Sequence, residues 1–151
     1  MKIVKMSKGH AVSYLDWKYE KPYEFYNTPL HARDEADAEI FDDNGVDFFS
    51  VLDEKEDLFG IYEYSFSKDI MEIGFGIRPQ GTGKGYGKCF VKECMNFGRR
   101  YYNYDGKITL RVADFNERAI YLYKSIGFIE VGFENTESFG TPVTFIKMEL
   151  L

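Results

Sequence analysis

The residues best suited to chemistry lie between Gln80 and Lys88, where glycine occupies every second position from 81 to 87. Residues 70–79 before this stretch alternate like a strand, and the residues after it have helical periodicity. A strand, a glycine turn and a helix start together favour an anion, because bare N–H groups converge there and the helix dipole adds positive charge. Lys84 and Lys88 add full charges, so we expect a phosphate-bearing ligand at this turn.

Two common phosphate-binding motifs do not fit this turn. A Walker A loop would need glycine at position 78 and serine or threonine at position 85, where the chain has Arg78 and Gly85. The dinucleotide motif Gly-x-Gly-x-x-Gly would need glycine at Tyr86 or at Lys88. Neither motif therefore explains the turn. The alternative to a phosphate-binding turn is a plain glycine-rich surface turn.

The turn resembles the pyrophosphate loop of the GNAT superfamily, the acyl-CoA-dependent N-acyltransferases. Their motif is Gln/Arg-x-x-Gly-x-Gly/Ala at the end of a strand, and two registers fit it. Residues 80–85 match literally, whereas the place of Pro79 puts Thr82 at the first position with Gly85 and Gly87 as the motif glycines. We favour the second register. It replaces a long side chain near the pyrophosphate by a hydroxyl, so backbone amides must contribute more.

A second segment supports the same resemblance. Residues 116–128 read Asn-x-x-Ala-Ile-x-Leu-Tyr-x-x-x-Gly-Phe, which is similar to the second diagnostic segment of GNAT proteins. Asn116 is a favourable N-cap and Gly127 a favourable C′ residue, so the sequence specifies both ends of a short amphipathic helix. The two motifs occur in the family's order, and the resemblance covers about residues 70–135.

Periodicity along the chain predicts the elements that must position these residues. We expect strands at 2–7, 46–53, 57–66, 70–77, 107–113, 128–134 and 143–150, and helices at 9–20, 32–41, 86–101 and 117–126. Residues 21–29 and 135–142 are expected to be loops. This order predicts an α+β fold with a central mixed, mostly antiparallel sheet flanked by helices. The resemblance implies a sheet splayed between the strands 70–77 and 107–113.

The composition indicates one domain, residues 1–151, which is long enough to bury a core. The net charge of −6 argues against nucleic acid as a partner and is compatible with a cationic substrate. No apolar run approaches the roughly 20 residues of a membrane span, and the N-terminus lacks the apolar core of a signal peptide. We therefore expect a cytoplasmic protein with no membrane partner.

The cysteines and histidines indicate neither a disulfide nor a metal site. Cys89 and Cys94 lie five residues apart in one predicted helix, so they do not share a face and should stay reduced. His10 and His31 are distant in the sequence, and no Cys/His cluster has the spacing of metal ligands. We expect no metal.

The resemblance implies acetyl-CoA as co-substrate. It assigns the pantetheine arm to backbone groups of Phe75, Gly76 and Ile77. It assigns the pyrophosphate to the turn, namely Thr82, Gly83, Lys84, Gly85, Tyr86, Gly87 and Lys88. Asn116 would contact the cofactor, or it would only cap its helix.

The resemblance also implies a direct attack of an amine on the acetyl thioester. Tyr123 occupies the place of the tyrosine that protonates the leaving thiolate in similar enzymes, and the alternative is a core tyrosine. Glu72 lies near the place where some relatives have a carboxylate that could accept the amine proton, and the alternative is an ordinary salt-bridged strand residue. Arg111 stands where relatives that acetylate ribosomal N-termini have glutamate, which weakens the transfer of their substrate to this chain, although the motif as a whole resembles theirs.

The acceptor amine cannot be read from these motifs. A polyamine, a small amino metabolite, an antibiotic and a protein N-terminus all remain open. The loop with Tyr23, Phe25 and Tyr26 is either a satellite cluster on the core or the wall of the acceptor site. A non-catalytic acyl-CoA-binding module is the alternative function, and a homodimer is compatible with these features.

Overall fold

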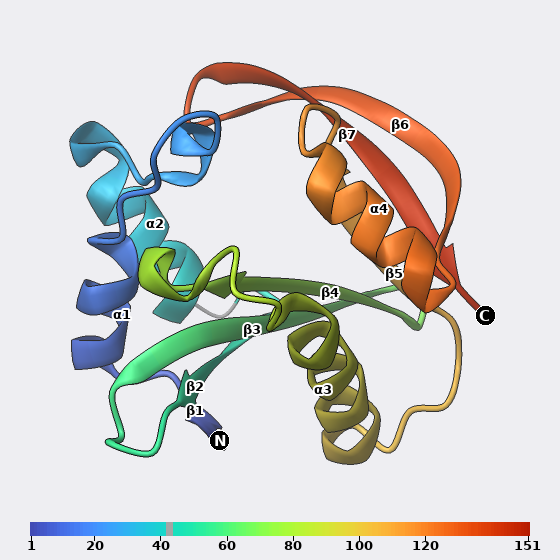
Figure 1. Cartoon of the computed structure of the whole chain (residues 1–151), viewed down its shortest axis with the longest axis horizontal. Coiled ribbons are helices and arrows are strands. Elements are labelled where there is room, and N and C mark those ends of the chain that lie inside the picture. The colour runs from blue at the N-terminus through green and yellow to red at the C-terminus, as the bar shows by residue number, and fades with distance from the viewer. Residues whose placement is uncertain (42–43) are drawn as a thin grey trace. The chain divides into compact units, whose positions relative to one another are not determined.

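A computed structural model describes residues 1–41 and 44–151 (Figure 1). The strands follow the hydrogen-bonding order β1-β2-β3-β4-β5-β7-β6. β4 pairs with β5 in parallel, whereas the pairs β1–β2, β2–β3, β5–β7 and β6–β7 are antiparallel. The prediction of a mixed, mostly antiparallel sheet with flanking helices is confirmed. The strands are β1 (Lys2–Lys5), β2 (Val46–Leu52), β3 (Leu58–Ser67), β4 (Ile70–Ile77), β5 (Ile108–Ala113), β6 (Ile129–Ser138) and β7 (Thr141–Leu150). The α-helices are α1 (Lys8–Leu15), α2 (Arg33–Phe41), α3 (Gly87–Tyr101) and α4 (Glu117–Ile126).

The chain forms two compact units. The first unit comprises Met1–Ser65 and Phe75–Tyr86, and the second comprises Phe66–Gly74 and Gly87–Leu151. The backbone passes from the second unit to the first inside β4, and it returns at the end of the glycine-rich segment. That both units form a single domain stays a prediction.

The first unit packs α1 and α2 side by side with the antiparallel strands β1, β2 and β3 (Figure 1). Ala11 and Leu15 lie one helical turn apart on α1 and are both buried, as a helix with one apolar face requires. Ser7 begins α1, because its hydroxyl oxygen accepts the N–H of His10 at 3.2 Å. α1 therefore starts and packs as an amphipathic helix should.

The first helix is shorter than the sequence predicts. It ends at Leu15, so the prediction of helix through residue 20 is wrong. The Trp17 N–H bonds back to the carbonyl of Tyr14, and the Trp17 ring packs edge-on against the Tyr14 ring. The Tyr19 N–H donates to the side-chain oxygen of Asn27 at 2.6 Å. These contacts, two within the end of the helix and one with the following loop, replace the hydrogen bonds that another helical turn would make.

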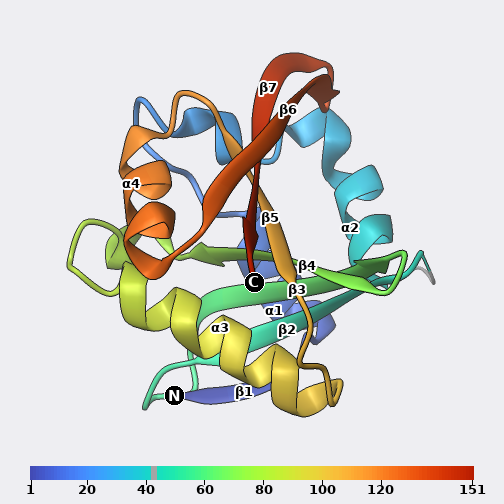
Figure 2. The same cartoon turned by 90° about the vertical axis from the view of Figure 1, so that its right-hand side faces the viewer.

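The second unit contains α3 and α4 together with the ladder of β5, β7 and β6 (Figure 2). Ile108, Leu110 and Val112 alternate along β5 and are buried, which is the period of a strand with one covered face. The start of α3 approaches α4 closely, since a Cβ atom on Gly87 would lie 2.9 Å from Cδ2 of Leu122. The first turn of α3 is thus fixed by packing.

The last two strands are longer than the sequence predicts. β6 and β7 form a long curved hairpin (Figures 1 and 2) whose pairing continues to Ser138 and Thr141. The prediction of a loop over residues 135–142 is therefore wrong. Phe139 and Gly140 both have positive φ, 49° and 84°, which is the two-residue turn that suits the twist of a hairpin. Phenylalanine is not a usual residue at such a turn, so the residue types did not predict a two-residue turn here.

The predicted ends of α4 are confirmed. The side-chain oxygen of Asn116 accepts the N–H of Ala119 at 3.2 Å, which caps the first turn. Gly127 has a φ of 122°, and its N–H donates to the carbonyls of Tyr123 and Lys124. Only glycine adopts such a φ without strain, so α4 stops there.

We predict that Gly127→Ala destabilises the protein by about 1–2 kcal/mol, because the left-handed φ is strained for alanine. A Cβ atom there would also lie 3.1 Å from Cδ1 of Leu150. Denaturant unfolding measures the change. Gly132→Ala in β6 is the matched control, since a Cβ atom at Gly132 has nothing within 4 Å. Equal stability of the two variants would contradict the prediction.

Candidate functional site

The glycine-rich segment begins with a 3-10 turn, Pro79–Gly81, directly after β4. The Gly81 N–H donates to the carbonyl of Arg78 at 2.8 Å. Thr82 donates twice to the carbonyl of Pro79, through its N–H at 3.3 Å and its hydroxyl at 2.8 Å. The Thr82 hydroxyl proton therefore closes this turn, and the open part of the loop starts after it.

The loop then bends through two left-handed glycines into α3 (the yellow-green segment of Figure 1). Gly83 has a φ of 72° and Gly85 a φ of 81°. Among residues 1–41 and 44–151, the amides of Gly83, Lys84 and Gly85 donate to no backbone acceptor. The first four N–H groups of α3 have no partner within the helix by geometry. With the exposed Lys84 and Lys88, the segment can offer several donors and two charges to an anion.

The end of β4 carries a contact that the sequence did not reveal. The Tyr19 hydroxyl donates to the carbonyl of Ile77 at 2.6 Å. Burial raises the pKa of Tyr19, so its hydroxyl keeps its proton at neutral pH. The Ile77 carbonyl, which we expected to contact the pantetheine arm, thus already accepts a hydrogen bond. The roles of Phe75 and Gly76 stay predictions.

Two predicted site residues share α4 in the second unit. Tyr123 is 8% exposed, and its ring packs edge-on against Phe128 with centroids 6.3 Å apart. Asn116 lies seven residues earlier, which is two helical turns, so both positions fall near one side of the helix. The cap role of Asn116 is confirmed, whereas its contact with the cofactor stays a prediction.

Glu72 lies in an ion-pair network of the second unit. Its Oε1 is 3.4 Å from Nε of Arg111. Arg111 also contacts Glu134 at 3.6 Å, and Lys147 contacts the other oxygen of Glu134 at 3.7 Å. The Arg111 guanidinium lies over the ring of Phe145. Glu72 is therefore a salt-bridged strand residue, and its role as a base stays a prediction.

The aromatic loop between α1 and α2 forms a cluster of its own. It contains a 3-10 turn, Glu24–Tyr26, in which the rings of Phe25 and Tyr26 meet edge-on with centroids 5.3 Å apart. The ring of Tyr26 also meets that of Tyr19 at 6.4 Å. The loop, which includes Tyr23, is thus folded onto the same segment that contacts Ile77. Its role in acceptor binding stays a prediction.

Comparison with known proteins identifies the family of the chain. A sequence model of the acetyltransferase (GNAT) family matches residues 11–128. The chain belongs to this family. The resemblance to the GNAT superfamily, the predicted fold class and the assignment as an N-acetyltransferase are thereby confirmed. Catalysis is favoured over the alternative of a non-catalytic binding module.

The relatives of this GNAT chain include polyamine acetyltransferases. The spermidine N(1)-acetyltransferase of Vibrio cholerae serotype O1 is 27% identical over 128 residues, which cover 78% of this chain and 67% of that protein. A solved chimera of the Vibrio cholerae spermidine N-acetyltransferase and hSSAT is 25% identical and covers 100% of this chain and 96% of its own, with a TM-score of 0.75. The Vibrio cholerae spermidine/spermine enzyme with manganese ions has the same fold at 22% identity, coverages of 99% and 91% and a TM-score of 0.74.

The first unit of this GNAT chain also holds two glutamates that act electrostatically on Tyr14, a partly buried tyrosine of α1. Partial burial is the largest cause that raises the pKa of Tyr14, and Glu63, Tyr19 and Glu39 follow. Burial and the neighbouring Glu35 raise the pKa of Glu39. The sequence alone does not reveal this group, because Glu63 lies far from Tyr14 and Glu39 in the chain.

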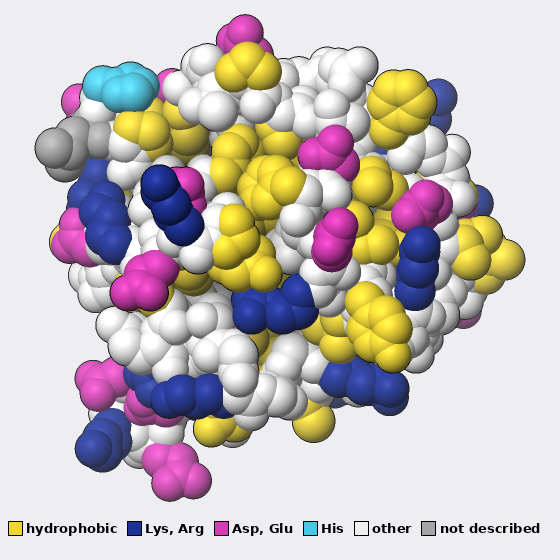
Figure 3. All heavy atoms as spheres, turned by 45° about the horizontal axis from the view of Figure 1, so that its top comes forward, with side chains coloured by type: hydrophobic (Ala, Val, Ile, Leu, Met, Phe, Trp, Pro, Cys, Tyr) yellow, Lys and Arg dark blue, Asp and Glu magenta, His cyan; other side chains and the backbone are white. Residues whose placement is uncertain are grey.

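Lys and Arg side chains are interspersed with Asp and Glu on the face shown in Figure 3. Within the described ranges, no group of three or more His, Cys, Asp or Glu could hold a metal ion. No helix in that same part of the chain is long and apolar enough to cross a membrane.

Proposed function

We propose that this chain transfers the acetyl group of acetyl-CoA to a primary amine by direct attack. The observation that supports it most is the loop that enters α3 through Gly83 and Gly85, since its open amides and lysines suit a diphosphate. This loop lies within the residues that match the GNAT family. Bound acetyl-CoA would supply an activated thioester, and the chain would orient it and move protons.

The diphosphate would be held mainly by the backbone. The Thr82 hydroxyl donates to Pro79, so it cannot also donate to a phosphate oxygen. The amides from Gly83 to Lys88 and the charges of Lys84 and Lys88 are the donors that remain in this segment. Backbone groups of Phe75 and Gly76 would hold the pantetheine arm. Asn116 would contact the cofactor.

Tyr123 would give the proton that the leaving thiolate needs. Its position on the buried side of α4 keeps the hydroxyl away from bulk water, which favours directed proton transfer. Glu72 would accept the proton of the amine, directly or through water. Arg111 contacts Oε1 of Glu72, so the proton would go to Oε2.

A polyamine is the acceptor that the observations favour. The relative with 27% identity is a spermidine N(1)-acetyltransferase. The net charge of −6 is compatible with a polycationic acceptor. The aromatic loop with Tyr23, Phe25 and Tyr26 would supply further contacts. Other primary amines are outcomes of the test.

We predict that acetyl-CoA binds with a micromolar dissociation constant in calorimetry. With a panel of amines, spermidine and spermine should give the fastest release of free thiol. Failure to bind at millimolar acetyl-CoA would contradict the proposal. Binding without thiol release by any amine would instead support a non-catalytic module.

We predict that Gly85→Ala weakens acetyl-CoA binding by about tenfold, because a strained φ displaces amides that the diphosphate needs. Gly45→Ala is a matched control. Both glycines have a φ of 81°, and a Cβ atom on either has nothing within 4 Å. The two variants should lose similar stability in denaturant unfolding. Equal acetyl-CoA affinity in both would remove the loop from the binding site.

We predict that Tyr123→Phe lowers kcat by about 100-fold, the usual effect of losing a general acid, with acetyl-CoA affinity changed by less than about twofold. Tyr121→Phe is the control, because Tyr121 lies on the same helix and is 77% exposed. Steady-state kinetics and calorimetry separate the two effects. If Tyr123→Phe keeps full activity, Tyr123 is only a core residue.

A further inference from the structure

The glycine-rich loop is fastened to the turn between β2 and β3. Arg78 lies between β4 and the loop, and its Nη1 is 3.1 Å from Oδ2 of Asp53, the residue directly after β2. The Arg78 N–H donates to the carbonyl of Phe59 at 2.8 Å. The Arg78 guanidinium lies over the Phe59 ring, 5.1 Å from its centroid. The residue that starts the loop is thus held by a carboxylate, a carbonyl and a ring.

The same ring touches the loop at two later points. A Cβ atom on Gly81 would lie 3.2 Å from Cε1 of Phe59 and 2.8 Å from Cγ2 of Ile77, so the loop backbone lies directly against the ring. The ring of Tyr86, the last residue before α3, meets Phe59 edge-on at 5.6 Å. Phe59 therefore contacts the chain before, within and after the bend. Because it is 4% exposed within β3, it is a fixed support.

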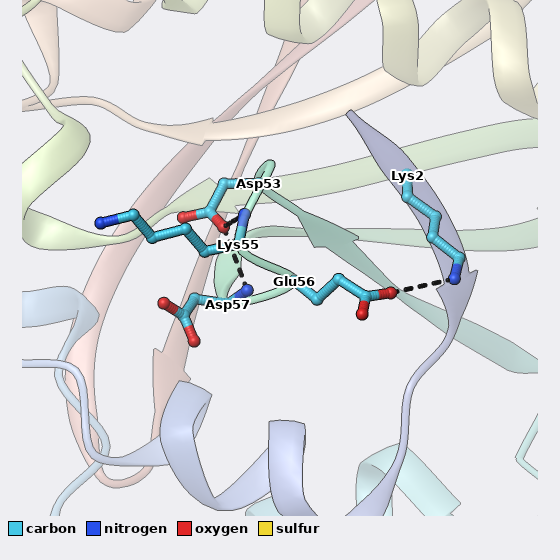
Figure 4. A network of polar contacts seen from close by, with 5 residues as sticks. All are labelled: Lys2, Asp53, Lys55, Glu56 and Asp57. Carbon is cyan, nitrogen blue, oxygen red and sulfur yellow. Dashed lines mark hydrogen bonds and ion pairs between the residues drawn. The ribbon is translucent and has the colours of Figure 1, made fainter.

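Asp53 uses its two oxygens for different partners. Oδ1 accepts the N–H groups of Lys55 and Asp57, at 2.9 and 3.0 Å, and these bonds close the turn between β2 and β3 (Figure 4). Oδ2 contacts Arg78. The bonds from the turn, and then those from Arg78, lower the pKa of Asp53, so the carboxylate is charged at neutral pH.

We propose that Asp53 and Arg78 are positioning residues that hold the loop in the conformation that receives the diphosphate of acetyl-CoA. The inference rests on the proposed function and adds the turn between β2 and β3 to its requirements. Nη1 of Arg78 is directed to Asp53, so the role assigned to Arg78 is to fix the loop. A loop with two left-handed glycines has little rigidity of its own, and affinity for its ligand depends on such external support.

The sharpest variant is Asp53→Asn. The amide oxygen can still accept the N–H groups of Lys55 and Asp57, whereas the amide nitrogen would face Arg78 as a second donor. We expect the KM and the dissociation constant for acetyl-CoA to rise about tenfold, as for a lost charge-assisted hydrogen bond, and kcat to change by less than about twofold. Glu56→Gln is the matched control.

Glu56 suits this comparison because it lies on the same turn as Asp53. Its side chain points away from that of Asp53 and pairs with Lys2 (Figure 4). The side chains of Lys2 and Glu56 are 62% and 69% exposed, against 32% and 19% for Arg78 and Asp53. An exposed pair contributes little, so Glu56→Gln should leave acetyl-CoA binding unchanged.

A second variant tests whether Arg78 acts through Asp53. Arg78→Leu keeps an aliphatic stem on Phe59 and removes the charge, and it should raise the KM for acetyl-CoA to a similar extent. The double variant should be no worse than either single variant, because the two residues form one contact. If Arg78→Leu does not fold, Arg78→Lys keeps the charge without the planar contact and should show a smaller rise.

S-acetylpantetheine separates positioning of the diphosphate from general damage, since it lacks the diphosphate. Activity with S-acetylpantetheine should be unchanged in both single variants. An unchanged KM for acetyl-CoA, or an equal loss with both donors, would overturn the positioning role alone. A wild-type chain that fails to bind acetyl-CoA would overturn the proposed function as well.

Discussion

The contact between the Phe59 ring and the chain that follows β4 is the constraint on which the candidate site depends. The loop is rich in glycine, and an isolated glycine-rich chain samples many backbone conformations. Phe59 belongs to a buried strand, so its position is set by the core of the first unit. Arg78, Gly81 and Tyr86 each touch this ring, which transfers the rigidity of the strand to the bend. A permissive backbone is thus held in one shape by packing.

A second constraint is that carboxylates on the sheet must be compensated by nearby cations. On the sheet of the second unit, Glu72 and Glu134 contact Arg111, and Glu134 also contacts Lys147. These carboxylates are compensated by neighbouring cations. In the first unit, Asp53 is likewise paired with Arg78, and Glu63 and Glu39 add to the burial that raises the pKa of Tyr14. Neighbouring cations therefore compensate carboxylates in both units.

Local signals were sufficient for much of the fold. The caps of α4 at Asn116 and Gly127 depend on residues within one helical turn, so the sequence predicted them correctly. The alternation of Met71 and Ile73 with Glu72 and Gly74 likewise matched β4. The hairpin turn at Phe139 and Gly140 was missed because phenylalanine is not typical of a position with positive φ. The end of α1 was missed because residues after it bond outside the helix, as Tyr19 does to Asn27, and helical periodicity does not report such a contact.

By itself, the sequence determined the strand, the glycine-rich bend and the two helix starts, because these depend on neighbours a few residues apart. It also determined the GNAT family, since both motifs are contiguous. Only the tertiary structure decided what holds the bend: the ring of Phe59, the carboxylate of Asp53 and the hydroxyl of Tyr19 reach it from 19 to 58 residues away. No local pattern reports such contacts, because they exist only after the strands have paired and brought distant side chains together.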